Sequence, residues 1–521
     1  MKRFSNYMLL CLFTFGIFTS CKQKAEQTTE PDTLIKTTFG AVSGSIDDDI
    51  FAFKGIPYAK ADRFMPPQDP DSWQGVRETT EFGPVAKQVV AWIDEANMDE
   101  KNLFNLNVWT PSTKDGKKRP VMVWFHGGGF HIGSSNDPMT YGKALAKKGD
   151  VVIVSVNHRL NILGFLDLSA YDEKYKQSAN AGILDAVKAL EWVKNNIENF
   201  GGDSSNVTIF GESGGGGKVG TLMCMPSAKG LFHKAIIQSG TLINVMTKEK
   251  SQALGKTVLE NLGVTAENLN QLDTISYQRL VKAGNDAILS ISGPRQPGAK
   301  TMFGFAPSAD GETLLQQPFS PGFADISNDI PLLMGTTLNE LINTAYGEKD
   351  LTLEQAKERL TKTYGNKTNQ FVELYEKAYP NFTPQDLLSI DTVFRPFTIR
   401  TLDARAAQSN APLYAYFLAW KSGVDDASKG SFHGLDIPLA FNTVDLRPDW
   451  TGDTPEAWEL AETMSSAWLN FAKTGNPNVP ERLPEWPIYT AETGATMYFD
   501  DESKVLNNHD RELMELVSSV D

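Results

Sequence analysis

A serine flanked by glycines is the first candidate nucleophile, in the stretch Gly211-Glu212-Ser213-Gly214-Gly215, which fits the pattern G-x-S-x-G. Val207 to Phe210, directly before it, is β-branched and aromatic and predicts a short buried strand. From Lys218 onward the sequence predicts a buried helix. In this pattern the serine lies on a strained strand-to-helix turn, and free N–H groups at the helix N-terminus suit an oxyanion. The stretch therefore predicts nucleophilic catalysis of acyl transfer.

Two other glycine-rich motifs compete for the same stretch. A phosphate-binding loop would need Gly at position 212 and Ser or Thr at 219, where the chain has Glu212 and Val219. Gly215-x-Gly217-x-x-Gly220 matches a dinucleotide fingerprint, but it lies past the end of the strand, and the next strand offers no acid for a ribose. A structural turn with an idle serine is the remaining alternative, which the partners of the serine must decide.

A serine nucleophile needs a base, and histidine is the usual one. In a parallel sheet with this kind of turn the chain order is Ser, acid, His, and of the six histidines only His433 and His509 come late enough. His433 lies in a loop after a predicted strand, Leu413 to Trp420, and is the predicted base. His509 lies in a charged segment near the terminus, where we expect it to be solvated.

The acid that orients the base should follow a strand between the serine and His433. Glu340 fits, because it comes shortly after the predicted strand Pro331 to Met334. Asp310 is the rival, although it precedes Gly311 and has the position of a turn aspartate. Donors for the oxyanion are expected from His126-Gly127-Gly128-Gly129, namely the N–H groups of Gly128 and Gly129, together with that of Gly214.

The elements around these residues alternate between strand and helix, which predicts a parallel, helix-covered sheet. We expect one large domain with helical insertions outside the sheet, at Ser251 to Leu289 and Leu353 to Tyr379. Further predicted strands are Leu106 to Pro111, Pro120 to Phe125, Val151 to Val156, Ala235 to Gln238 and Thr496 to Phe499, and further helices are Asn180 to Phe200 and Trp458 to Lys473.

The composition is that of a soluble globular enzyme, with 521 residues, 41% hydrophobic and 22% charged. A net charge of −15 argues against nucleic acid as a partner. Cys224 is the only cysteine in the body of the chain, so we expect a core thiol and no disulfide there. The sequence does not indicate an oligomeric state.

The N-terminal segment has the pattern of an export signal. Residues 1–20 predict a lipoprotein signal peptide, with Lys2 and Arg3 before an apolar run and Phe18-Thr19-Ser20-Cys21 resembling a lipobox. Cleavage before Cys21 would leave that cysteine to be acylated and anchored in a bacterial membrane, followed by a polar tether over residues 21–32 and the folded domain over 33–521. A plain secretory peptide and a secreted protein are the alternative.

With these motifs in place, the chain resembles the type-B carboxylesterases, relatives of the cholinesterases within the α/β-hydrolases. The resemblance covers nearly the whole mature length. The motifs that carry it are Gly55-Ile56-Pro57-Tyr58-Ala59, Leu106-Asn107-Val108-Trp109, His126-Gly127-Gly128-Gly129-Phe130, Asn157-His158-Arg159-Leu160, Asn180-Ala181-Gly182-Ile183-Leu184-Asp185, Asn199-Phe200-Gly201-Gly202-Asp203, Val207 to Ser213, Gln238-Ser239-Gly240 and Phe471-Ala472-Lys473-Thr474-Gly475.

The resemblance implies the α/β-hydrolase fold, a mostly parallel central sheet covered by helices with helical insertions around the active-site gorge. It places a catalytic triad on Ser213, Glu340 and His433. It further implies that Ser239 hydrogen-bonds the acid and that Arg159 and Asp185 form a structural ion pair. No metal or cofactor is implied.

Several positions depart from the family pattern. Gly214 replaces the usual alanine, and Lys101-Asn102-Leu103 stands where the family has an acid and a disulfide cysteine. Thr337 to Leu341 replaces the usual Asn-Lys-Asp-Glu-Gly around the acid. Trp92 is the one candidate for the choline-binding tryptophan, although we expect it to serve packing.

The sequence thus predicts a serine carboxylic-ester hydrolase that acts on small to medium neutral esters through an acyl-enzyme. A catalytically silent, adhesion-type relative and a serine peptidase of the same fold are the alternatives. The three glycines of the oxyanion loop predict room for esters of tertiary alcohols, and Gly128→Ala is expected to affect those esters most.

Overall fold

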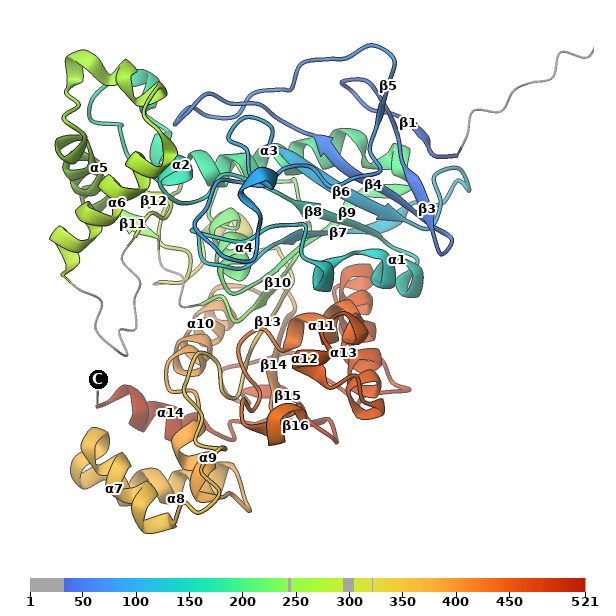
Figure 1. Cartoon of the computed structure of the whole chain (residues 1–521). Coiled ribbons are helices and arrows are strands. Elements are labelled where there is room, and N and C mark those ends of the chain that lie inside the picture. The colour runs from blue at the N-terminus through green and yellow to red at the C-terminus, as the bar shows by residue number, and fades with distance from the viewer. Residues whose placement is uncertain (1–31, 242–244, 294–303, 321, 521) are drawn as a thin grey trace, which may run out of the picture. The chain divides into compact units, whose positions relative to one another are not determined.

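In the computed structural model, which describes residues 32–241, 245–293, 304–320 and 322–520, the chain is built on one large sheet (Figure 1). The predicted leader and Cys21 lie outside the described residues. The strand order is β16-β15-β14-β13-β10-β9-β7-β8-β6-β4-β3. The seven strands from β15 to β8 are mutually parallel, and the outer pairs are antiparallel. The strands are β3 (Ser45–Asp47), β4 (Ile50–Pro57), β6 (Asn105–Thr110), β7 (Arg119–Phe125), β8 (Val152–Val156), β9 (Gly202–Glu212), β10 (Lys234–Gln238), β13 (Leu332–Thr337), β14 (Leu413–Leu418), β15 (Ala495–Phe499) and β16 (Lys504–Asn507).

Two small sheets lie outside the large one. One joins β1 (Leu34–Lys36), β2 (Ala41–Ser43) and β5 (Val76–Glu78), and the other joins β11 (Met246–Thr247) and β12 (Ser308–Ala309). The helices are α1 (Lys143–Gly149), α2 (Asn161–Phe165), α3 (Ala181–Asn196), α4 (Gly214–Leu222), α5 (Lys248–Leu262), α6 (Tyr277–Ser292), α7 (Leu353–Tyr364), α8 (Thr368–Ala378), α9 (Pro384–Ser389), α10 (Phe394–Gln408), α11 (Asp436–Phe441), α12 (Pro448–Thr451), α13 (Pro455–Thr474) and α14 (Arg511–Ser518). None of the described helices is long and apolar enough to cross a bilayer.

Each face of the sheet is buried under helices, and the alternation along the strands decides which core a side chain joins. On β7, Val121 and Val123 join a core that includes α3 and α4, whereas Met122 and Trp124 join a core that includes α11 and α13. A third core lies among α7, α8 and α14. Because both faces are covered, the stretch Val121 to Phe125 of β7 is apolar throughout, as the sequence shows.

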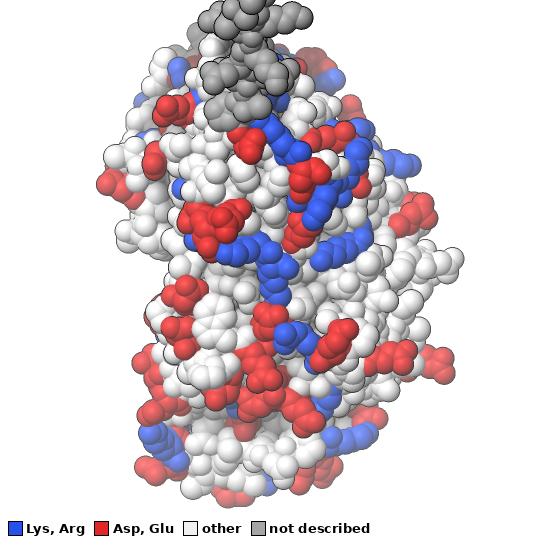
Figure 2. All heavy atoms as spheres, turned by 90° about the vertical axis from the view of Figure 1, so that its right-hand side faces the viewer, with Lys and Arg blue, Asp and Glu red and all other residues white. Residues whose placement is uncertain are grey.

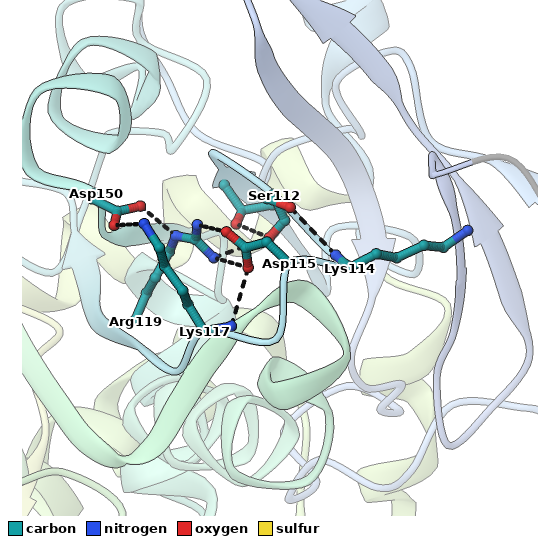
Figure 3. Close-up of polar contacts among 7 residues, drawn as sticks. Ser112, Lys114, Asp115, Lys117, Arg119 and Asp150 are labelled. Carbon is teal, nitrogen blue, oxygen red and sulfur yellow. Dashed lines mark hydrogen bonds and ion pairs between the residues drawn. The ribbon is translucent and has the colours of Figure 1, made fainter.

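The surface carries charges of both signs, as the face in Figure 2 shows, where Lys and Arg side chains lie among Asp and Glu. Figure 3 shows a cluster of such charges at the start of β7. Arg119 is 3% exposed, its Nε lies 2.6 Å from Asp150 Oδ1, and it also pairs with Asp115. These ion pairs fix the N-terminal end of β7, whose opposite end carries the glycine loop of the site.

Candidate active site

Ser213 lies on the turn between β9 and α4, at the carboxyl end of the parallel strands. Its backbone has the positive φ of a strained turn, +54°, with ψ −121°, and its N–H donates to the Gln238 carbonyl at 2.8 Å. A Cβ on Gly215 would lie 2.0 Å from the Phe125 carbonyl oxygen, so only glycine lets helix and strand approach this closely. The helix begins at Gly214, not at Lys218 as predicted, because the glycines form its first turn instead of a loop.

Two loops bring the predicted base and acid together. His433 Nδ1 lies 2.5 Å from Glu340 Oε2. The other carboxylate oxygen, Oε1, accepts a hydrogen bond from Ser239 Oγ at 2.8 Å and one from the Thr337 N–H at 2.9 Å. Glu340 is therefore held on both oxygens, and its carboxylate fixes the orientation of the His433 ring.

The second ring nitrogen of His433 faces the residue before the serine. Nε2 lies 3.3 Å from Glu212 Oε1, and the His433 side chain is 14% exposed. Burial disfavours the charged ring, but the charges of Glu212 and Glu340 outweigh it and raise the pKa of His433 above its usual 6.5. Burial also disfavours the charged form of Glu212 and so raises the pKa of its carboxyl. Glu212 directly precedes Ser213, so this contact brings the His433 ring to the turn that carries the serine.

Two more buried carboxyl groups surround this pair, and sequence reasoning missed both. Asp391 accepts N–H bonds from Val393 and Arg395, while burial and the charge of Glu340 raise its pKa to about 7. Asp436 accepts a bond from Tyr416 Oη at 2.7 Å, and burial raises its pKa. The imidazolium of His433 would therefore form among several buried carboxyl groups.

The glycine loop after β7 packs directly on the first turn of α4. Gly128 and Gly129 have φ of +84° and +64°, and no described residue accepts a hydrogen bond from either N–H. A Cβ on Gly214 would lie 2.2 Å from the Gly129 nitrogen. The loop and the helix N-terminus thus meet with free donors on the loop, which is what an oxyanion hole requires.

The structure corrects the role expected of a methyl group at Gly128. A Cβ there would lie 2.3 Å from the Ile132 carbonyl oxygen, so it points into the loop and not toward an alcohol. Gly127 is the position whose Cβ would face the site, 3.1 Å from Glu212 Oε2 and 3.6 Å from Ser213 Cβ.

A cavity of about 1110 Å³ opens over these residues. Its lining includes Gly127, Gly128, Glu212 and His433, and also Trp92. Trp92 is 69% exposed, so the expectation that it serves packing is wrong. The remaining lining joins aromatic side chains to several acids, namely Phe82, Trp124 and Trp450 with Glu81, Asp94 and Asp137, and one cation, Arg447.

The rival residues lie elsewhere. The prediction that His509 is solvated is wrong. The residue is buried, with its ring edge-on to Tyr379 and Tyr498. Neither ring nitrogen has a hydrogen-bond partner among the described residues, and Nδ1 lies 3.6 Å from Asp510 Oδ1. Asp310 Oδ1 accepts three N–H bonds from residues 312 to 314, the contacts of a turn aspartate. Neither residue contacts Ser213.

Arg159 and Asp185 form a buried ion pair away from the nucleophile. Nη2 and Oδ1 are 2.6 Å apart, and Nε and Oδ2 are 2.8 Å apart. Arg159 also donates to the Met65 carbonyl at 2.8 Å, which ties the N-terminal loops to α3. The pair supports the scaffold and does not reach the site. Cys224 is free and buried, and burial raises its pKa to about 11, as a core thiol requires.

Comparisons with known proteins agree with this geometry. A model of the carboxylesterase family matches residues 31–516. The para-nitrobenzyl esterase of Bacillus subtilis (strain 168) is 35% identical over 497 residues, which cover 92% of this chain and 97% of that protein. The cocaine esterase of Homo sapiens is 30% identical over 505 residues, covering 88% and 86% of the two chains.

A solved structure extends the likeness to the fold. An esterase from anaerobic Clostridium hathewayi, which can hydrolyze aliphatic aromatic polyesters, has a TM-score of 0.84 to this chain. It is 35% identical, and the match covers 94% of this chain and 98% of that one. The predicted α/β-hydrolase fold is thereby confirmed.

Proposed function

The chain belongs to the carboxylesterase family and is a type-B carboxylic-ester hydrolase, and we propose that Ser213 is its nucleophile. His433 is the general base, and Glu340 is the carboxylate that orients it. The observation that carries this proposal is the 2.5 Å contact between His433 Nδ1 and Glu340 Oε2 beside the turn that bears Ser213. With Nδ1 protonated and held by Glu340, Nε2 is the nitrogen free to take a proton.

The reaction then proceeds in two halves. Ser213 Oγ attacks the ester carbonyl while His433 Nε2 takes its proton, and the tetrahedral intermediate collapses when the same nitrogen protonates the leaving alcohol. Water then attacks the acyl-enzyme while His433 Nε2 takes one of its protons, and the second tetrahedral intermediate collapses when His433 returns that proton to Ser213 Oγ, which releases the carboxylic acid. The N–H groups of Gly128, Gly129 and Gly214 stabilise the oxyanion in both halves, supported by the free donors on the loop.

The cavity supports neutral esters of small to medium size as substrates. Its volume of about 1110 Å³ is ample for such an ester, and its aromatic side chains suit an aryl or alkyl group. Glu81 and Asp94 on the lining would repel a substrate with a free carboxylate. The relatives that are esterases of para-nitrobenzyl esters and aliphatic aromatic polyesters point to aromatic esters as the first compounds to try.

Ser213→Ala tests the nucleophile. We expect loss of at least 10³-fold in kcat on a para-nitrophenyl ester, with an unchanged thermal unfolding midpoint, since triad removal typically costs several orders of magnitude. A fluorophosphonate probe should label the wild type and not the variant. Retention of more than a hundredth of the wild-type rate would reject Ser213 as nucleophile.

We also propose that the chain is exported and anchored through a lipid on Cys21, a proposal that the sequence of the leader supports. Cys21→Ala should prevent lipid attachment, so that the protein stays unprocessed or appears in the soluble fraction. Metabolic labelling with an alkyne fatty acid followed by fractionation measures this. A processed variant that remains in the membrane fraction would exclude the anchor.

A further inference from the structure

A buried lysine without a carboxylate partner lies behind the oxyanion loop. Lys218, in α4, is 0% exposed, and its Nζ donates to the His126 carbonyl at 2.7 Å. Among the described residues it forms no ion pair with Asp or Glu, and that carbonyl is its one hydrogen-bond acceptor. Burial lowers the pKa of its ammonium to about 7. A group this costly to bury calls for a role other than packing.

The groups around Lys218 offer no negative charge either. Phe130 lies with its ring centroid 5.9 Å from Nζ. The rings of His126 and His158 stack 4.9 Å apart, and neither Nε2 has a partner among the described residues. Burial, together with the charge of Lys218, lowers the pKa of His126 and of His131, which keeps both rings neutral near pH 7. The carbonyl of His126 is therefore the specific contact that Lys218 makes.

That carbonyl belongs to the peptide unit that leads into the glycine loop. Its C=O and the N–H of Gly127 share one plane, so a bond to the oxygen also fixes the direction of the N–H. Gly127, at one end of this plane, has no Cβ, so the plane can rotate there at little steric cost. The next peptide unit carries the N–H of Gly128, and its carbonyl, that of Gly127, lies 2.9 Å from His126 Nδ1. Contacts between Gly214 and Gly129 set how closely the loop approaches α4, but the Lys218 bond sets which way the peptide plane faces.

Lys218 and the nucleophile lie on the same rigid element. Ser213 is the N-cap of α4 and Lys218 is its fifth residue, so the lysine joins the loop to the helix that carries the serine. From this geometry we propose that Lys218 is a positioning residue. It holds the His126–Gly127 peptide plane at the start of the glycine loop and so keeps the N–H groups that follow, those of Gly128 and Gly129, aimed at the oxyanion. The inference rests on the oxyanion hole proposed above.

Lys218→Met tests it, because methionine has similar length, fits an apolar site and donates no hydrogen bond. We expect kcat on a para-nitrophenyl ester to fall 10- to 100-fold, KM to change less than about threefold, and the unfolding midpoint to stay equal or rise. Affinity for an aryl trifluoromethyl ketone, whose adduct with Ser213 mimics the tetrahedral intermediate, should fall by the same factor as kcat/KM. Unchanged kcat, or unchanged affinity for the ketone, would overturn the proposal. If this variant does not fold, Lys218→Leu is measured in the same way.

Arg405→Met is the matched control, since Arg405 is also buried and donates to carbonyls, those of Ser327 at 2.7 Å and Ile330 at 2.8 Å, far from the site. It should lose stability but keep wild-type kcat per titrated active site. An equal loss of kcat in both variants would mean general loosening and would overturn the inference. A failure of the proposed function gives a different result, because Ser213→Ala would then keep its activity, whatever the activity of Lys218→Met.

Discussion

At the scale of single residues, the carboxylate neighbours of His433, the proposed base, set the pKa of its ring. Glu340 holds Nδ1 of His433, and Glu212 faces Nε2 at 3.3 Å. Both carboxylates favour the imidazolium, which helps the step in which His433 becomes charged. They also raise the pH at which the free ring becomes neutral and able to act as a base. The same contacts therefore assist the transition state and limit activity at low pH.

The pH profile of Glu212→Gln follows from this arrangement. Wild-type kcat/KM should decline on the acid side with an apparent pKa above the 6.5 of an ordinary histidine, because His433 must be neutral to act. The amide carries no charge, so the acid limb of the variant should move to lower pH. Profiles of kcat/KM from pH 4 to 10 measure both limbs. An acid limb at the same pH in both proteins would contradict this account.

At the scale of elements, the oxyanion loop is held from three sides. β7 carries it, the first turn of α4 packs against Gly129, and Lys218 holds its first peptide unit. Its glycines serve different purposes. Gly128 is required by a positive φ and a close carbonyl, while a Cβ at Gly127 would crowd Glu212 and lie beside Ser213.

Substituting alanine for Gly128 and for Gly127, one at a time, should distinguish these two roles. Gly128→Ala is expected to lower the rates of primary and tertiary acetates alike, by about 10²–10³-fold, because the loop must move and donors are lost. Gly127→Ala places a methyl beside Ser213 and should reduce hydrolysis of the tertiary acetate several times more than that of the primary one.

Rates on matched primary and tertiary acetates decide between these outcomes. We expect the wild type to turn over the tertiary ester, although more slowly than the primary one. The absence of tertiary turnover in the wild type would refute the idea of a permissive loop. So would equal losses on both esters in Gly127→Ala.

At the scale of the whole molecule, the C-terminal helix is fixed by a buried polar cluster. Arg395 Nε, on α10, pairs with Asp510 Oδ2 at 2.8 Å directly before α14. His509 packs beside them between Tyr379 and Tyr498. Burial lowers the pKa of His509 to about 4, so the folded protein resists its protonation.

This cluster makes the protein less stable to unfolding as the pH falls. An unfolded His509 takes a proton near pH 6.5, whereas the folded one does so only near 4, so its contribution is complete above 6.5 and is lost as the pH falls between those values. At pH 5 the loss is about 2 kcal/mol. Phenylalanine fits the aromatic surrounding and does not titrate. In urea unfolding, the free energy of unfolding of His509→Phe should therefore fall about 2 kcal/mol less between pH 7 and 5 than that of the wild type. It should also keep wild-type kcat, while His433→Ala should not. An equal loss of stability in wild type and variant would disprove the assignment.

The amino-acid sequence by itself determined the family and the strand–helix alternation, and it predicted the residues proposed to carry the chemistry. The motifs G-x-S-x-G and His-Gly-Gly-Gly are enough to predict this turn and loop. A turn this tight admits only glycine at fixed positions, so its geometry can be recognised from the residue types. The chain order of Ser213, Glu340 and His433 likewise follows from loops that all lie at the carboxyl ends of parallel strands. These are local or topological facts that a linear pattern can carry.

Only the tertiary structure decided the environment of those residues. Burial and partners depend on segments far apart in the chain, so the sequence placed His509 in solvent and Trp92 in packing, whereas the first is buried and the second exposed at the cavity. Lys218 gave no sign of its bond to His126, because 92 positions separate the two residues. The pKa values of Glu212 and His433 arise in the same way, since desolvation and charge act through space and not along the chain.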